Sequence, residues 1–386
     1  MSEHLQSEKV ALRTIAREWG RLGLVGVGGP PTHIALLRRL CVDERGWIDA
    51  REFEDGIAAV NLLPGPASTQ LAIYCAWRLR GALGGLVGGL CFITPGLVII
   101  TALAALFLEH HPPLWVLGAA AGSGAAVPAV ALHAASRLAS ASPARHGARK
   151  SDLVRWSLYA VAGAVCAATA GAFVVVVLLA CGALELAWRA EGRRSGTRAA
   201  APLALHVAAV GGVGALAWVA LKVGALSYGG GFVIIPLMQH DVVNTYHWMS
   251  GAQFLNAVAL GQVTPGPVVL TIAVVGYAAA GIAGALLATA LAFGPSFLFV
   301  LGGATHFERI RSSAAVRSFL AGAGPAVIGA IAGSAVSLGL ALKHPWQVPV
   351  LAVALLWLLG LRRGVVSAVL VAGLVGLVLA LVGVAV

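Results

Sequence analysis

The amino-acid sequence predicts an all-α polytopic membrane protein made of two inverted-topology repeats with broken, re-entrant helices. Its composition is 59% hydrophobic and 11% charged, with a mean hydropathy of +0.90, which leaves too little polar surface to cover a soluble globule. The apolar runs are long enough for helices to cross a hydrocarbon core of about 30 Å, and they lack the alternation of barrel strands. The tripeptide Pro-Gly-Pro also occurs twice, in the same surroundings.

The two Pro-Gly-Pro tripeptides, Pro64–Pro66 and Pro265–Pro267, are 201 positions apart. The same offset relates Gly28-Gly29 to Gly229-Gly230, Trp47 to Trp248 and Phe53 to Phe254. The chain is therefore a duplicated membrane protein in which each half interrupts a helix at the same place. Hydrophobic segments that are broken at matching positions of two halves are the best indicator, at the level of sequence, of a transporter's substrate site.

Basic side chains cluster between the apolar segments. The first 21 residues hold no apolar stretch suited to a signal peptide, and they predict a polar helix that carries Arg13, Arg17 and Arg21. We expect this N-terminus on the cytoplasmic side of a bacterial inner membrane. The net charge of +11 comes from arginine clusters that flank apolar segments, which is the positive-inside pattern rather than a nucleic-acid surface. We expect contact with the lipid bilayer and no nucleic-acid partner, and a homodimer is compatible with the sequence.

The charge clusters also predict the topology. Residues 239–252, which match the arginine-rich residues 38–51, contain no Lys or Arg, whereas Arg309, Arg311 and Arg317 appear where the first half has an uncharged loop. The charges swap sides between the halves, which predicts repeats of opposite orientation related by a pseudo-two-fold axis in the membrane plane. The predicted parts are a cytoplasmic N-terminal helix (1–21), a first repeat (22–188), a basic linker with one connecting span, Leu203–Leu221 (189–221), and a second, inverted repeat (222–386).

Two segments of the first repeat have basic flanks at both ends. Residues 53–77 are expected to enter and leave by the same face, turning at Pro64-Gly65-Pro66, and residues 22–37 are expected to do the same around Gly28-Gly29-Pro30. With their counterparts they give about nine full spans plus four half-membrane hairpins. The alternative is that the broken segments cross fully, which gives up to 13 spans and violates the positive-inside pattern once.

The helix breaks predict an anion site. Proline interrupts a helix that reaches it, whereas proline in the first turn of a new helix is harmless, so a half-helix starts after each Pro-Gly-Pro. Its free N–H groups and the positive end of its dipole attract anions. Neighbouring side chains add hydroxyl and amide groups. The predicted substrate-binding residues are Asn61, Pro64, Gly65, Pro66, Ser68, Thr69 and Gln70 in the first copy, and Gln262, Thr264, Pro265, Gly266, Pro267 and Thr271 in the second.

Weaker candidates lie at the glycine-rich breaks. Gly28, Gly29, Pro30 and His33, with Tyr228, Gly229 and Gly230 of the second copy, are candidates for lining the path. The plain structural alternative is that these residues only kink or pack membrane helices. Two copies in matching context, each next to an amide side chain, favour the functional interpretation for Pro-Gly-Pro.

Other classes of function find little support in the sequence. The five cysteines are scattered without CxxC spacing, so we expect neither a metal site nor a cofactor. No Walker A sequence is present. Gly122-Ser123-Gly124 with His133 suggests an intramembrane serine hydrolase as a remote alternative, although Ala121 breaks the Gly-x-Ser-Gly spacing of rhomboid-type enzymes. After residue 200 the only acids are Asp241 and Glu308, which leaves few candidates for proton coupling.

The motifs together resemble the chromate ion transporter (CHR) family in its long, two-domain form. The resemblance rests on Gly28-Gly29-Pro30 with His33-Ile34-Ala35, on Trp47 and Phe53, on the run from Asn61 through Pro64-Gly65-Pro66 to Gln70, and on the degenerate second copy. Val27 stands where the family commonly has Phe. The resemblance implies efflux of chromate across the inner membrane and hence chromate resistance. A carrier of sulfate or another tetrahedral oxyanion is the alternative, because sulfate shares the shape and charge of chromate.

Overall fold

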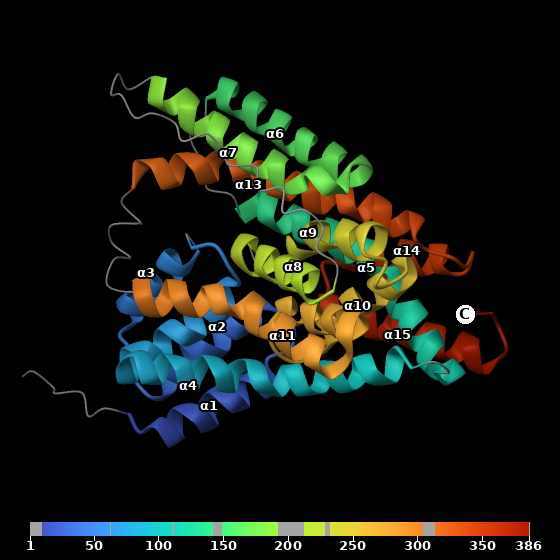
Figure 1. Cartoon of the computed structure of the whole chain (residues 1–386), viewed down its shortest axis with the longest axis horizontal. Coiled ribbons are helices and arrows are strands. Elements are labelled where there is room, and N and C mark those ends of the chain that lie inside the picture. Colours follow the sequence, from blue (N-terminus) through green and yellow to red (C-terminus); the bar gives the residue numbers. More distant parts are fainter. Residues whose placement is uncertain are drawn as a thin grey trace, which may run out of the picture.

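The computed structural model describes residues 10–61, 63–109, 112–141, 149–191, 212–227, 232–303 and 313–385, and these residues form helices and no strand (Figure 1). The first half contains α1 (Leu12–Val25), α2 (Pro30–Arg38), the π-helical turn η1 (Arg39–Glu44), α3 (Ala50–Val60), α4 (Ala67–Phe107), α5 (Leu114–Ala141), α6 (Lys150–Thr169), the 3₁₀ turn η3 (Gly171–Phe173) and α7 (Val174–Glu191). The second contains α8 (Val213–Leu226), α9 (Ile234–His240), the π-helical turn η4 (Asp241–Thr245), α10 (Gly251–Val263), the 3₁₀ turn η5 (Val268–Leu270), α11 (Thr271–Gly303), α13 (Ala314–Leu340), α14 (Gln347–Leu355), the π-helical turn η7 (Leu356–Gly360) and α15 (Val365–Leu381).

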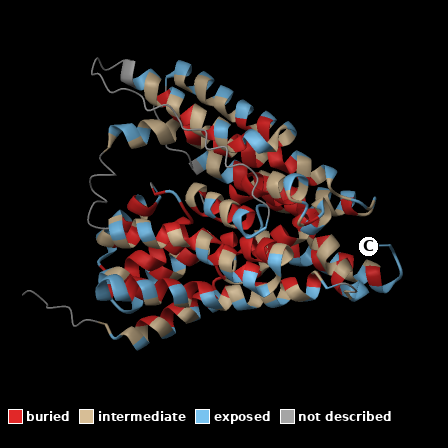
Figure 2. Cartoon of the chain, in the orientation of Figure 1, coloured by how far each residue is buried: buried red, intermediate tan, exposed pale blue. Residues whose placement is uncertain are grey.

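The apolar helices confirm an all-α polytopic membrane protein. Within the described residues, five helical stretches are long and apolar enough to cross a membrane: Ala67–Phe107, Leu114–Ser140, Gly171–Arg189, Val268–Gly303 and Ala314–Leu340. Shorter apolar helices cover Val213–Leu226, Gln347–Gly360 and Val365–Leu381. Buried residues gather in the middle of the bundle, whereas the outer helices carry exposed side chains (Figure 2). Many of these exposed side chains are Leu and Val, as expected of a surface that faces lipid.

The duplication is visible helix by helix. Helix α1 and helix α8 have the same length, and their first residues, Leu12 and Val213, are again 201 positions apart. The same offset relates the starts of α3 and α10, and the starts of α4 and η5. The predicted boundaries at residues 22 and 222 lie inside α1 and α8, and part of the predicted connecting span, residues 203–211, lies outside the described residues. The division into domains stays a prediction.

Each break in the first half turns the chain back. Arg45, which follows η1, bonds Glu18 of α1 at 3.4 Å, so the chain returns past its own first helix. Arg78, near the end of the helix that follows Pro-Gly-Pro, pairs with Glu52 at the start of α3. Both partners of each pair therefore lie at one end of their hairpin. These contacts support the re-entrant interpretation over the fully crossing one.

Helix α4 is itself a hairpin. Arg80 and Gly81 have non-helical backbone angles, with φ +63° at Gly81, a conformation that favours glycine. A Cβ on Gly84 would overlap the carbonyl oxygen of Ala76, eight residues earlier, which is possible only if the two arms lie side by side. Helix α11 repeats the turn at Ala280-Gly281. Each Pro-Gly-Pro break is thus followed by a short arm that folds back on a long arm able to span the membrane.

The long arms of α4 and α11 run in opposite directions (Figure 1). Gly85 lies against Leu301 and Gly89 lies against Phe297, so residue numbers rise along one arm as they fall along the other. Helices α5 and α13 are likewise drawn in opposite directions (Figure 1). The two copies are therefore inverted relative to each other, as the swapped charges predict.

The last helices of each half pack on the other half. Helices α6 and α7 lie along α13, and helices α14 and α15 lie along α5. Glycines let these helices approach closely: a Cβ on Gly163 or Gly329 would overlap a carbonyl oxygen across the α6/α13 contact, and one on Gly122 would do so across the α5/α15 contact. Small residues at such contacts are typical of membrane helices. The exchange joins the two halves into one interlocked bundle.

Candidate functional site at the helix breaks

The two Pro-Gly-Pro breaks dock on opposite halves by equivalent hydrogen bonds. The N–H of Gly65 donates to the carbonyl oxygen of Ser227 at 3.1 Å, and the N–H of Gly266 donates to the carbonyl oxygen of Gly26 at 2.9 Å. Donors and acceptors are both related by the 201-residue offset. Gly65 and Gly266 have φ of +125° and +100°, which glycine adopts without steric cost. Each break is therefore fixed at the end of the first helix of the other copy.

A half-helix starts directly after each break. Helix α4 begins at Ala67 after Pro66, and the turn η5 begins at Val268 after Pro267. No side chain caps either start, and the prolines themselves carry no N–H. The first N–H groups of a helix have no partner within the helix, and they carry the positive end of its dipole. Both starts are buried. The N–H groups of Thr69 and Gln70 donate to the Pro66 carbonyl oxygen and that of Leu270 to the Pro267 carbonyl oxygen, so the candidate donors are the N–H groups of the two residues directly after each break.

Unpaired buried polar atoms concentrate around the same breaks. Among the described residues, seven buried side-chain oxygen or nitrogen atoms have no hydrogen-bond partner, and five of them lie at or beside the breaks. They are Thr69 Oγ1, Gln70 Oε1, Ser227 Oγ, Gln262 Nε2 and Ser296 Oγ. Buried polar groups are nearly always bonded in native structures, so each exception needs an explanation. Hydroxyl and amide N–H groups of this kind are partners for an anion or for water.

The five groups differ in whether they donate or accept a hydrogen bond. The three hydroxyls donate or accept, and the Gln262 amide nitrogen donates. Gln70 Oε1 is a carbonyl oxygen and only accepts, and the amide nitrogen of the same side chain donates to the Pro64 carbonyl oxygen at 2.7 Å. The Gln70 oxygen suits a water molecule or the hydroxyl of a protonated oxyanion. The set therefore matches a hydrated or partly protonated oxyanion better than a bare cation, which would need a ring of acceptors.

His33 links the two breaks. Its Nε2 lies 3.0 Å from the Gly26 carbonyl oxygen, the same oxygen that accepts the Gly266 N–H, and its Nδ1 lies 3.3 Å from Ser68 Oγ. A carbonyl only accepts, so Nε2 carries the proton, and in the neutral ring Nδ1 accepts from the Ser68 hydroxyl. The residue is 1% exposed, and its ring packs in a T-shaped arrangement with Phe92, with ring centroids 5.1 Å apart. One side chain thus connects the half-helix of the first copy to the break of the second.

Comparisons with known proteins show the family of this chain. A family model described as chromate transporter matches residues 13–186 and 214–378, stretches that begin inside α1 and α8. The chain belongs to the chromate transporter family. It is 33% identical over 337 residues to the chromate transport protein of Cupriavidus metallidurans, covering 85% of this chain and 82% of the relative.

Two further relatives match over most of their length. The chromate transport protein of Pseudomonas aeruginosa is 31% identical, covering 92% of this chain and 89% of the relative. The probable chromate transport protein of Synechococcus elongatus is 29% identical, covering 95% of both chains. No solved structure matches the chain.

Sequence reasoning missed two polar residues of the candidate site, Ser296 and Ser227. Ser296 belongs to the long arm of α11, and a Cβ on Gly65 would lie 2.9 Å from its hydroxyl oxygen. Ser227 follows α8 and supplies both the carbonyl that holds Gly65 and an unpaired hydroxyl. Each long arm contains a proline, Pro95 in α4 and Pro295 in α11, and this shared proline could have pointed to Ser296, the residue after Pro295. In the first copy the residue after the proline is Gly96, which lies against the Pro265 carbonyl oxygen.

The structure distributes the other predicted site residues unevenly. Gly65, Pro66, Ser68, Thr69, Gln70, Gln262, Gly266 and Pro267 are buried at the breaks, with Thr264 and Thr271. The hydroxyls of Thr264 and Thr271 donate to the carbonyls of Leu260 and Val268, both at 2.8 Å. The hydroxyl proton of each threonine therefore already has a partner. Asn61 and Pro64 are exposed, and Pro265 is half-buried. Which of these residues bind substrate stays a prediction.

The path-lining candidates divide in the same way. Gly29 is buried, with its Cβ position 3.5 Å from a methyl group of Val268, so the glycine break of the first copy faces the second Pro-Gly-Pro. Gly28 is exposed and Pro30 is half-buried. Tyr228, Gly229 and Gly230 lie outside the described residues.

The hydrolase alternative has no dyad in the structure. Ser123 Oγ donates to the Val369 carbonyl oxygen at 3.3 Å across the α5/α15 contact. His133 lies ten residues further along the same helix, which places it about 15 Å away at the rise of an α-helix. Ser123 is therefore a packing residue with a satisfied hydroxyl.

Proposed function

We propose that this chain exports chromate, or a closely related tetrahedral oxyanion, across the inner membrane and thereby gives chromate resistance. The observation that carries the proposal is the cluster of unpaired buried polar atoms at two reciprocally docked helix breaks. The chain belongs to the chromate transporter family, and two of its relatives are named chromate transport proteins. These names support chromate as the substrate.

The site suits a divalent anion that must also leave. Backbone N–H groups at helix starts, hydroxyls and amides supply partial positive charge without a full cation. None of the five unpaired atoms belongs to Lys or Arg, so within the described residues these groups would hold the anion by their dipoles alone. Transport requires binding that is favourable enough for the ion to enter and weak enough for it to leave.

The membrane potential supplies a driving force for export. A divalent anion that leaves a cell with an interior of −100 mV gains about 4.6 kcal/mol, twice the value for one charge. Export therefore needs no coupled ion under these conditions, whereas concentrative uptake would. This direction agrees with the scarcity of carboxylates in the second half, where Asp241 and Glu308 are the only acids after residue 200.

Flux into everted inner-membrane vesicles tests the proposal. We expect vesicles that contain the protein to accumulate chromate when the lumen is made positive, and control vesicles not to. Excess sulfate in the medium distinguishes the two oxyanions: full competition would indicate a general oxyanion carrier, and weak competition a chromate transporter. An absence of chromate accumulation under an imposed potential, with the protein inserted, would refute export.

A further inference from the structure

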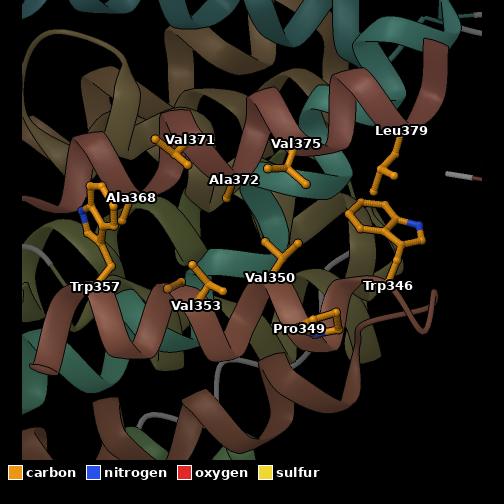
Figure 3. Close-up of a pocket in the computed structure, with 11 residues that line it drawn as sticks. Trp346, Pro349, Val350, Val353, Trp357, Ala368, Val371, Ala372, Val375 and Leu379 are labelled. Atoms are coloured by element: carbon orange, nitrogen blue, oxygen red, sulfur yellow. The ribbon is translucent and has the colours of Figure 1, made fainter. Parts of the chain in front are cut away.

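An apolar groove opens between the last two helices of the chain. It has a volume of about 320 Å³ and is lined by side chains of α14, η7 and α15, with no charged group among them (Figure 3). Trp357 lies at one end and Trp346 at the other, and Val350 and Val353 face Val371 and Val375 across it (Figure 3). This groove is separate from the helix breaks and lies on the outside of the bundle.

The groove exists because α14 and α15 both pack mainly on α5 and contact each other much less. Their ends are joined by tryptophan hydrogen bonds: Trp346 Nε1 donates to the Ala385 carbonyl at 3.0 Å, and Trp357 Nε1 donates to Ser367 Oγ at 3.1 Å. Between these two bridges the groove separates most of the two helices (Figure 3). The equivalent pair in the first half, α6 and α7, is instead tied by Arg155, which bonds Glu185 at 2.6 and 3.0 Å.

One mouth of the groove is basic. Arg362 and Arg363 follow Leu361, the residue after η7, and both are exposed. The Arg363 N–H donates to the Trp357 carbonyl at 3.0 Å, which fixes this turn beside the tryptophan. Neither arginine takes part in an ion pair within the described part of the chain. Their charge is therefore available to a group outside the protein.

The length of the groove matches one leaflet. Trp346 and Trp357 are eleven positions apart, about 16 Å along a helix, and half of a hydrocarbon core of about 30 Å is about 15 Å. Val353 and Val371 are 57% and 42% exposed, so the groove is open to the lipid at its side.

We propose that the groove binds one acyl chain of an anionic phospholipid, whose phosphate pairs with Arg362 and Arg363. The apolar walls fit the chain, the length fits one leaflet, and the two unpaired guanidinium groups fit the headgroup. The inference does not depend on the transported ion. A second copy of this protein is the other candidate occupant, and the experiment below distinguishes the two.

Lipid retention by the purified protein tests the site. The full chain is reconstituted with dioleoyl phosphatidylglycerol or dioleoyl phosphatidylcholine, washed in detergent, and its bound lipid is counted by native mass spectrometry. We expect one phosphatidylglycerol on the wild type. V353W and V375W fill the groove from opposite walls and should lose the lipid. V348W places the same side chain on α14, at a site that is 60% exposed and outside the groove, and should keep it.

Charge variants test the headgroup. Replacing both Arg362 and Arg363 by Gln should weaken phosphatidylglycerol binding by about 30-fold, since each basic side chain near an anionic surface contributes about a factor of five. K343Q removes one charge near the other end of the groove and should have no effect. Equal retention of both lipids, loss in K343Q, or retention by both tryptophan variants would overturn the proposal. A cross-linked dimer that V353W abolishes while lipid binding persists would assign the groove to a second copy.

Discussion

Gly65 determines both the backbone conformation and the space for neighbouring side chains at the first Pro-Gly-Pro break. It adopts φ +125°, its N–H holds the Ser227 carbonyl, and a Cβ would lie 2.5 Å from Gln70 Nε2 and 2.9 Å from Ser296 Oγ. Any side chain would therefore strain the turn and also displace two polar groups of the candidate site. The residue combines a conformational requirement with a steric one, and the two can be separated by experiment.

We expect Gly65→Ala to reduce chromate flux by at least about tenfold, since backbone strain of this kind costs about 1 to 3 kcal/mol and the clash adds to it. Gly46→Ala is the matched control, because Gly46 also has a positive φ, +57°, yet no atom lies within 4 Å of its Cβ position. Flux per inserted protein in everted vesicles measures both. Equal loss in the two variants would show that strain alone matters, and normal flux in Gly65→Ala would remove this residue from the site.

At the residue scale the sequence predicts the groups that lie next to a recognisable motif. Gln70 and Gln262 flank Pro-Gly-Pro, and the structure leaves one polar atom of each unpaired and buried. Ser227 and Ser296 come from elements distant in sequence, and no local pattern places them beside Gly65. His33 was expected only along the path, because a hydrogen bond to the carbonyl that holds the other break depends on the docking of the two copies.

The helix breaks are the elements on which the fold and the proposed site both depend. Pro64 and Pro265 follow the ends of α3 and α10. After each proline the chain reverses through a glycine with positive φ, Gly65 or Gly266. Such reversals are local, so proline and glycine reveal them in the sequence. The equivalence of α1 and α8 is harder to detect, because α1 carries Arg13, Arg17 and Arg21 and resembles a cytoplasmic helix, whereas α8 is almost wholly apolar.

We expect Pro64→Ala and Pro265→Ala to abolish transport while membrane insertion stays intact. Alanine restores an N–H and removes the clash that ends the helix, a change of about 3 kcal/mol in favour of helical continuation. Pro128→Ala is the control, because Pro128 lies inside the continuous helix α5 and ends nothing. Flux and the amount of protein in the membrane fraction are measured together. Export at the wild-type rate by both break variants would mean that the breaks are not the site.

The whole molecule is two inverted copies that exchange their last helices. The inversion can be predicted from the sequence, because basic residues are concentrated in cytoplasmic loops, and the equivalent loops that carry them differ between the two halves. The exchange cannot, because α6 packing on α13 depends on small residues that let backbones meet, and alanine and glycine are everywhere in this chain. Inversion matters for function because it lets two equivalent half-helices approach from opposite faces of the membrane.

Opposite orientation makes a direct prediction for equivalent loops. Asp43 and Asn244 are both exposed and are related by the 201-residue offset, so inverted copies place them on opposite faces. In cells that express Asp43→Cys or Asn244→Cys, a membrane-impermeant maleimide added outside should label only Asn244→Cys, since the arginine-rich loop around Asp43 should be cytoplasmic. Four of the five native cysteines are buried and Cys91 is partly exposed, so the unmodified chain measures the background. Everted vesicles should show the reverse pattern. Labelling of both variants from one side would show that the copies point the same way, and two dipoles could then no longer approach one anion from opposite faces.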